Sequence, residues 1–494
     1  MGCCHRNPEA RAYILDCASR ATVGISNIFL GYAILKYAAK AAGCEEVRNL
    51  RPSRKWGESA MLRPRAQVGK EICGKRLPGG LRASSLLTVM LTVGYVAVAL
   101  CLPLVGALVD STPHRRRVGL YTSYVLIAIQ ALEMGISEAT WEAMAALQVA
   151  AQVAYLLHLV PHFAYIPELT RDETDLASIQ ATALGSGYGA SFFMILCIVG
   201  AGGGASDAAR VGQGLSAFAL AATLPYAWHV LNADRPALRK RTPGTPLVVA
   251  GFARLRTTAA KTRTEYPQLW RFILGLSCWE ASTSAFLGLL PTYLAVFVQM
   301  TANQIASTLG VALVFTIAGA FASKRLTAAS NPKAVVIGAL TFLALVAFAV
   351  PLVVAGPKQK GALYAFGACI GFGNGVAYPA QRVLFTLLIP GGCEAEMWGI
   401  YSFAGAVLVW VPPLVFTLIN ELAGMRFALW SLCVLYAAGI PRGAAVDLDK
   451  ARADVASTLG ARHYDHQDGA VLPPPNTNGA ARTAPEAEPT RVEA

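Results

Sequence analysis

Charged residues are scarce in this sequence. They make up 14% of its 494 residues, whereas a soluble domain carries about 25%. Hydrophobic residues reach 55%, and the mean hydropathy is +0.46. So little charge leaves too little water-facing surface for a soluble enzyme, and the apolar content excludes a disordered chain. The composition therefore indicates a polytopic membrane protein.

Metal-binding patterns are also missing. The 11 cysteines form no C-x-x-C pair, and the histidines show no zinc-type spacing. We therefore expect no metal site. The excess of 42 Lys and Arg over 29 Asp and Glu, a net charge of +13, lies mainly in loops between apolar runs. Because cytosolic loops of membrane proteins face an anionic leaflet, the excess indicates a lipid bilayer and not a nucleic-acid partner.

Long apolar runs dominate what is present. A bilayer core about 30 Å thick needs about 20 apolar residues per helix, and twelve stretches qualify. They are residues 17–39, 84–109, 118–137, 141–165, 180–201, 211–231, 269–299, 303–322, 333–355, 361–388, 397–422 and 424–440.

The spacing of these runs predicts an all-α polytopic membrane protein with twelve transmembrane helices. Two six-helix halves, residues 1–232 and 269–440, flank a basic cytosolic linker, residues 233–268. Residues 441–494 are charged and rich in Pro and Ala, which predicts a disordered cytosolic tail. The layout is similar to that of the major facilitator superfamily, whose halves rock about a central substrate site.

The distribution of basic residues predicts the orientation. With the N-terminus in the cytosol, the outward loops after spans three, five, seven, nine and eleven hold only Arg210, Lys358, Lys360 and Arg426. Residues 44–83 disagree, because they would face outward and are strongly basic, but long loops follow the rule less strictly. We expect both termini in the cytosol.

Two covalent modifications are open alternatives. If residues 44–83 lie in an oxidising compartment, Cys44 and Cys73 form either a disulfide or two free thiols. At the N-terminus, acylation of Gly2, Cys3 or Cys4 competes with an ordinary cytosolic start. Myristoylation fits poorly, because an arginine stands at position 6 where that motif has Ser or Thr.

A short motif lies at the C-terminal end of the second predicted span. Gly106 and Asp110 are followed by the basic run Arg115, Arg116 and Arg117. This pattern resembles the signature loop of the major facilitator superfamily. Gly106 would allow close helix approach, and Asp110 would pair with an arginine in a cytosolic gating latch. The alternative is a basic loop that only sets orientation. A partial second copy, Gly319 to Arg325, has Ser323 in place of the acid.

Three further segments narrow the resemblance. They are Ala164 to Leu169 with its Pro167-Glu168 pair, Leu388 to Phe403 with its Glu-Ala-Glu run, and Gly424-Met425-Arg426. In this order the chain resembles the autophagy-related protein 22-like vacuole effluxer family. The resemblance implies export of amino acids, its favoured small-molecule substrate, from the vacuole lumen to the cytosol. It also implies an integral protein of the vacuole or another endomembrane.

The chain departs from that family where a substrate pocket would lie. The tenth span has Gln381-Arg382 where the family usually shows Ser-Arg, and Ala406 replaces an expected lysine. In the seventh span, Trp279 to Ser282 replaces a Tyr-Asn-Asp-Gly-like stretch. Two alternatives therefore stay open: a carrier of another small metabolite, or a non-transporting membrane scaffold or receptor.

Three ionisable residues are candidates for substrate or proton coupling. Glu280 lies about 16 Å into its span, near the membrane midplane. An ionised carboxylate is unfavourable there unless it pairs with a cation or lines a hydrated cavity. His158 and His162 lie four residues apart and share one helical face. Histidine titrates near neutral pH, which suits a proton relay, and satisfied polar packing is the alternative.

Four other charged residues have simpler interpretations. Arg382 is a further substrate or coupling candidate, with snorkelling to headgroups as the alternative. Asp16 and Arg20, also four apart, are expected to pair with each other. Glu133 is expected at the membrane interface.

Glycine-rich residues 371–375 lack the strand and the Gly-Lys-Ser/Thr of a phosphate-binding loop, so they are predicted to be a helix-packing segment, as are residues 185–189. No nucleophile–base–acid set stands out. We therefore expect a secondary transporter that is not an enzyme and that needs no cofactor.

Overall fold

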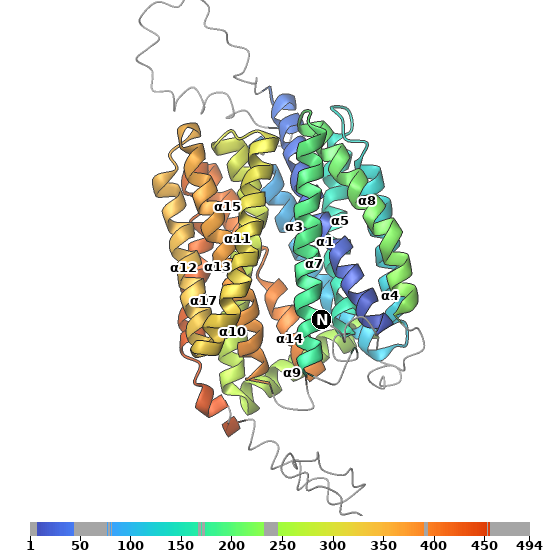
Figure 1. Cartoon of the computed structure of the whole chain (residues 1–494), viewed down its shortest axis with the longest axis vertical. Helices are drawn as coiled ribbons and strands as arrows, with labels where there is room; N and C mark the ends of the chain where they lie inside the picture. The colour runs from blue at the N-terminus through green and yellow to red at the C-terminus, as the bar shows by residue number, and fades with distance from the viewer. Residues whose placement is uncertain are drawn as a thin grey trace, which may run out of the picture.

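The computed structural model consists mainly of long helices in two bundles that stand side by side (Figure 1). It describes residues 7–43, 77, 80, 82–165, 169, 173–231, 246–389, 394–451 and 453–454. One bundle comes from the N-terminal half of the chain and the other from the C-terminal half. This arrangement agrees with the two predicted six-helix halves, whose boundaries stay a prediction.

The N-terminal bundle contains α1 (Pro8–Ala41), η3 (Ala83–Ser85), α3 (Leu86–Ser111), α4 (Arg115–Glu133), α5 (Trp141–Ala164), α7 (Glu173–Ala201) and α8 (Ala205–Val230). The C-terminal bundle contains α10 (Pro267–Thr292), η4 (Tyr293–Phe297), α11 (Ala302–Ala329), α12 (Pro332–Val353), η5 (Pro357–Gln359), α13 (Lys360–Thr386), α14 (Glu394–Val407), α15 (Val411–Leu422), α16 (Met425–Ala428) and α17 (Ser431–Ala444). Between them lies α9 (Leu247–Glu265).

Eight helical segments are long and apolar enough to cross a membrane. Among the described residues they involve α3, α5, α7, α10, α11, α12, α14 with α15, and α16 with α17. The other four predicted spans coincide with α1, α4, α8 and α13, which are long but carry more polar residues. Eight predicted spans are therefore confirmed as candidates, and a total of twelve stays a prediction.

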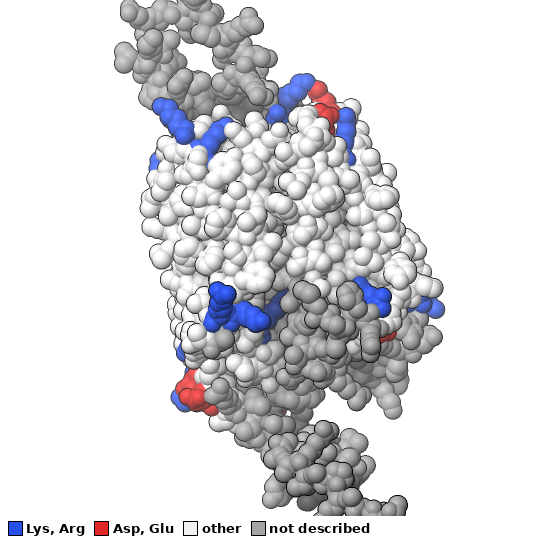
Figure 2. Space-filling view, in the orientation of Figure 1, with Lys and Arg blue, Asp and Glu red and all other residues white. Residues whose placement is uncertain are grey.

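The surface of the bundles is apolar. Figure 2 shows a broad white band between Lys, Arg, Asp and Glu residues that lie toward the two ends. Large side chains that are 63% to 74% exposed include Leu100, Phe193, Phe218, Phe321 and Leu345. Water would make so much exposed apolar area unfavourable, whereas lipid accommodates it. The chain is an integral membrane protein.

Hydrogen bonds between the two bundles gather at one end. Asn420 donates to the hydroxyls of Ser84 (3.0 Å) and Ser85 (2.9 Å), and Ser85 donates to Glu421 (2.8 Å). The hydroxyls of Thr88 and Thr417 lie 2.6 Å apart. These six residues, here called the interbundle seal, join η3 and the start of α3 to α15.

The predicted linker contains a helix that packs near the other end of α3. A Cβ on Gly251 of α9 would lie 2.3 Å from the carbonyl oxygen of Pro103. Gly251 therefore permits this contact between α9 and α3. A Cβ on Gly106 would meet no atom of the described residues within 4 Å, so close helix approach at this glycine stays a prediction.

Glycines join α11 to α13. A Cβ would lie 2.0 Å from the carbonyl oxygen of Ala312 if placed on Gly371, and 2.1 Å from that of Thr316 if placed on Gly375. The prediction of a helix-packing segment at residues 371–375 is confirmed. Within 185–189 only Gly187 packs closely, 3.3 Å from the Cβ of Ala21.

The predicted tail begins too early. The chain stays helical to Ala444, and Val446 and Ala451 are buried against the C-terminal bundle. Lys333 holds this segment, because its Nζ donates to the carbonyl of Val446 at 2.8 Å. Asp447 accepts a hydrogen bond from the backbone N–H of Lys450, which lowers the pKa of its carboxyl. Disorder from residue 441 is therefore wrong up to residue 451, while residues 455–494 lie outside the described part.

Candidate functional site

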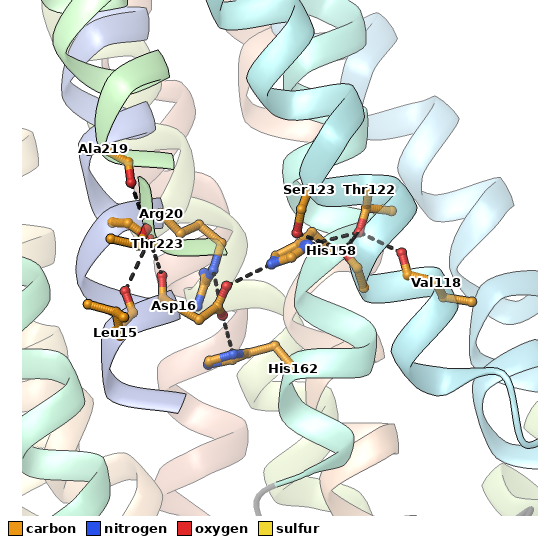
Figure 3. Close-up of polar contacts among 12 residues, drawn as sticks. Leu15, Asp16, Arg20, Val118, Thr122, Ser123, His158, His162, Ala219 and Thr223 are labelled. Atoms are coloured by element: carbon orange, nitrogen blue, oxygen red, sulfur yellow. Dashed lines mark hydrogen bonds and ion pairs between the residues drawn. The ribbon is translucent and has the colours of Figure 1, made fainter. Parts of the chain in front are cut away.

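The first polar cluster lies inside the N-terminal bundle and centres on Asp16 of α1 (Figure 3). Its Oδ1 lies 2.9 Å from Nε2 of His158. Its Oδ2 contacts Nδ1 of His162 and lies 3.6 Å from Nε of Arg20. None of these four side chains is more than 6% exposed. The predicted shared face of the histidines and the predicted pairing of Asp16 with Arg20 are confirmed, and the structure joins both pairs. We call these four residues the Asp16 cluster.

Aromatic rings enclose the Asp16 cluster. Tyr13 stacks on His162 with 4.0 Å between ring centroids. Trp228 of α8 meets His158 edge-on at 5.4 Å, and Tyr155 lies 5.6 Å from the Arg20 guanidinium. Because the rings limit access of water, the interactions among the charged groups are screened less than on a surface.

The second polar cluster surrounds Glu280 of α10. Tyr378 of α13 donates to Glu280 Oε1 at 3.0 Å, and Gln381 Nε2 lies 3.3 Å from Oε2. Trp279 donates its indole N–H to Gln381 Oε1 at 2.7 Å, which fixes the orientation of the Gln381 amide. The same Nε2 lies 2.5 Å from the Tyr401 hydroxyl. Glu280 is thus held by neutral donors.

Arg382 extends this second cluster toward the N-terminal bundle. Its guanidinium hydrogen-bonds Tyr401 of α14 and interacts electrostatically with Glu280. It also interacts electrostatically with Tyr13 of α1 and Tyr188 of α7. Arg382 is half-buried. Because Tyr13 and Tyr188 belong to the N-terminal bundle, the Arg382 guanidinium faces that bundle, and its role in substrate binding or coupling stays a prediction. We call Glu280, Arg382 and their tyrosine and glutamine partners the central site.

Glu133 occupies a third buried position. It is fully buried, and Gln130 donates to its Oε2 at 2.9 Å. Gln130 in turn accepts from Ser26 of α1 at 2.9 Å. Glu133 is the last residue of α4, as expected for the outer end of this span, but its side chain is buried against α1 instead of exposed, and its depth in the membrane stays a prediction.

Comparisons with known proteins identify the family to which this chain belongs. The family model described as "Vacuole effluxer Atg22 like" matches residues 6–190 and 178–456. The chain belongs to the Atg22-like family. The motif resemblance is thereby confirmed, and the chain is a member of a family of effluxers and not of enzymes. The comparison with curated proteins found no match.

Solved transporters share the fold of this Atg22-like chain. The xylose transporter XylE from E. coli, in an inward-open conformation, has 12% identity and a TM-score of 0.56 over 88% of this chain and 96% of its own. The human organic anion transporter MFSD10 has 17% identity and a TM-score of 0.56, covering 88% and 99%. The nucleoside transporter NupG has 13% identity and a TM-score of 0.57, covering 89% and 100%. At these identities the likeness concerns the fold alone.

The predicted cytosolic latch is described only in part. Arg115 is buried and lies 5.4 Å from the ring of Tyr165. Arg116 donates to the carbonyl of Trp228 at 2.9 Å, and Arg117 is exposed. The described contacts of Arg115 and Arg116 thus tie α4 to the ends of α5 and α8 within one bundle. The side chain of Asp110 lies outside the described residues, so its role in a latch stays a prediction.

Several other predicted features lie outside the described residues. These are the acylation candidates Gly2, Cys3 and Cys4, the Cys44–Cys73 pair, the Pro167-Glu168 pair, and the side chains of Glu394 and Glu396.

Sequence reasoning missed most of the partners in the central site. Tyr401 lies in the family-like run after Glu394, and Gln381 is a departure from the family pattern, but neither position predicts a contact with Glu280. Tyr13 and Tyr188 lie in the other half of the chain. One signal in the sequence could have suggested these partners: several tyrosines lie on predicted spans, and a charge inside the membrane needs polar partners such as tyrosine hydroxyls.

Proposed function

We propose that this Atg22-like chain exports amino acids from the vacuole lumen to the cytosol by alternating access. The central site would hold the substrate between the two halves. Twelve membrane-crossing helices and cytosolic termini belong to the same proposal. At 1.5 Å per residue, α1 with 34 residues, α8 with 26 and α13 with 27 exceed the roughly 30 Å core, and α4 with 19 nearly matches it.

The presence of Arg382 and Glu280 together in the central site carries this proposal. An α-amino acid presents a carboxylate and an ammonium group a few ångströms apart. A guanidinium recognises a carboxylate through paired N–H donors, and a carboxylate accepts hydrogen bonds from an ammonium. Sugars and nucleosides have no such pair of charges. The opposite charges of the central site therefore favour a zwitterion.

The location of Arg382 also suits alternating access. It belongs to the C-terminal bundle and interacts with Tyr13 and Tyr188 of the N-terminal bundle. A substrate carboxylate bound there would contact both halves. Rocking of the halves would then change the environment of the substrate.

The interbundle seal supports one assignment of state. It joins the bundles at the end of α3 that is opposite α9. If α9 is cytosolic, as the basic linker predicts, the seal closes the lumenal side. The conformation is then the one that faces the cytosol.

Uptake by purified protein in liposomes tests the proposal. The panel contains labelled zwitterionic amino acids, a hexose and a nucleoside, and each is measured with wild type, Arg382→Lys and the exposed-site control Arg271→Lys. We expect saturable uptake of amino acids by wild type and the control, and strongly reduced uptake by Arg382→Lys, because lysine cannot present two parallel donors. Uptake of the hexose or nucleoside alone would reject the amino-acid assignment. Absence of uptake of every solute would favour a scaffold or receptor.

A further inference from the structure

The hydroxyl of Thr122 sits between a histidine and its own helix (Figure 3). Its Oγ1 lies 2.8 Å from Nδ1 of His158. The same oxygen lies 2.8 Å from the carbonyl of Val118 and 3.0 Å from that of Gly119. A hydroxyl has a single hydrogen and two lone pairs. Thr122 can therefore donate either to the histidine or to its backbone, but not to both at full strength.

Each choice fixes a protonation state of His158. If Thr122 donates to Nδ1, the imidazole is neutral and its Nε2–H points to Asp16. If Thr122 donates to a backbone carbonyl, its oxygen accepts from Nδ1–H. Since Nε2 lies 2.9 Å from the Asp16 carboxylate, which can only accept, Nε2 keeps its hydrogen and His158 carries a hydrogen on both ring nitrogens. One proton added to Nδ1 converts the imidazole to the imidazolium. The heavy atoms keep their places, and only the hydroxyl hydrogen rotates.

The charges around His158 favour addition of one proton to its ring. Asp16 and Arg20 cancel, so the Asp16 cluster is neutral with neutral histidines and gains one positive charge with the proton. The Asp16 carboxylate at 2.9 Å stabilises the imidazolium. His162 is less suited to take the proton, because its Nε2 has no hydrogen-bond partner within the described part of the chain. The remaining facing groups are Tyr13 and Cys17 of α1, Tyr155 of α5, Ser123 of α4, and Thr223 and Trp228 of α8.

Tyr13 connects the Asp16 cluster to the central site. Its ring stacks on His162 of α5, and its hydroxyl lies within the electrostatic range of the Arg382 guanidinium of the C-terminal bundle. A substrate carboxylate bound at Arg382 would change the electrostatic potential at the Tyr13 side chain. A proton in the Asp16 cluster changes the field on the opposite side of the same residue. Tyr13 is therefore the side chain through which the two binding events would affect each other.

We propose that His158 is a proton-binding site and that the bound proton is coupled to transport. The coupling rests on the amino-acid transport proposed above, whereas proton binding by His158 does not.

Titration of His158 is the first test. Histidine ring nitrogens are labelled with ¹⁵N in the full-length protein in lipid nanodiscs, and NMR spectra are recorded from pH 4.5 to 8. Comparison with His158→Gln assigns the signal, and His229→Gln is the matched control on an exposed histidine. We expect Nδ1 of His158 to gain a proton within this range. Thr122→Val should change the midpoint, because Nδ1 loses its hydrogen-bond partner, while Thr122→Ser should leave it unchanged.

Transport driven by a pH gradient is the second test. In liposomes, the ratio of gradient-driven uptake to isotopic exchange should fall about tenfold in His158→Gln and not in His229→Gln. Tyr13→Phe should keep the His158 titration and lower the same ratio, because the ring stays and the hydroxyl is lost.

The outcomes separate the two proposals. An Nδ1 signal that does not change between pH 4.5 and 8 overturns the proton site. A titrating His158 with an unchanged uptake ratio in His158→Gln overturns the coupling. If wild type transports no amino acid, the proposed function fails, and the titration still decides whether His158 binds a proton.

Discussion

Neutralising Glu280 tests whether the central site recognises the ammonium group of an amino acid. Glu280→Gln keeps the shape of the side chain and can keep both hydrogen bonds. The new amide oxygen would accept from Gln381, and the new amide N–H would donate to the Tyr378 oxygen. The variant should therefore fold and reach the membrane. What it loses is the negative charge that would face the ammonium group of an amino acid.

The expected loss of affinity follows from that charge. A hydrogen bond to a charged group contributes about 1.5–3 kcal/mol, and 1.4 kcal/mol corresponds to tenfold in affinity. We expect the Kd for an amino acid to rise about tenfold to a hundredfold. Direct binding of a labelled amino acid to protein in nanodiscs at fixed pH measures it. Glu138→Gln is the matched control, because Glu138 is exposed and pairs with Lys40.

Two results would refute the reasoning. If Glu280→Gln binds the amino acid within twofold of wild type, Glu280 only packs the bundle. If the affinity falls equally for an amino acid and for an analogue without the amino group, the loss is not electrostatic recognition of ammonium.

Three further predictions concern the bundles and their ends. Gly375→Ala should lower thermal stability by about 1–3 kcal/mol, because its Cβ would lie 2.1 Å from a carbonyl oxygen of α11, whereas Gly338→Ala, with nothing within 4 Å, should not; equal melting temperatures would contradict the close packing. In a double variant, Ser84→Cys with Asn420→Cys, a short thiol-cleavable cross-linker should join the two bundles and stop transport. Cleavage of the cross-linker should restore transport. Full activity of the cross-linked protein would mean that the interbundle seal need not open. Asp110→Asn should slow transport without reducing membrane insertion, and a wild-type rate would leave the segment with a topogenic role only.

Much of the fold follows from the sequence alone. Eight predicted spans coincide with helices of sufficient length and hydropathy, because burial in lipid selects long apolar runs regardless of their neighbours. The close packing of Gly371 and Gly375 was also predictable, since small residues repeated along a span permit helix contact. Residues 441–451 were not, because their order depends on Lys333, which binds backbone carbonyls more than 100 residues away.

The partners in the two polar clusters were less predictable. Spacing identified His158 with His162, and Asp16 with Arg20, because those pairs lie one turn apart. Nothing local connects Asp16 to His158, which is 142 residues away. Such contacts depend on how each helix is rotated about its axis. In helices that are apolar on most sides, hydrophobic periodicity does not fix that rotation.

Ligand competition measures the central claim most directly. Binding of a labelled amino acid to wild-type protein is competed with the same amino acid, its methyl ester, which lacks the carboxylate, and its N-acetyl derivative, which lacks the ammonium. If Arg382 and Glu280 hold a zwitterion between the halves, both derivatives should compete at least tenfold less well. Arg382→Lys should reduce the preference for the acid over the ester, and Glu280→Gln the preference for the free amine over the N-acetyl form. Equal competition by all three compounds would contradict the account.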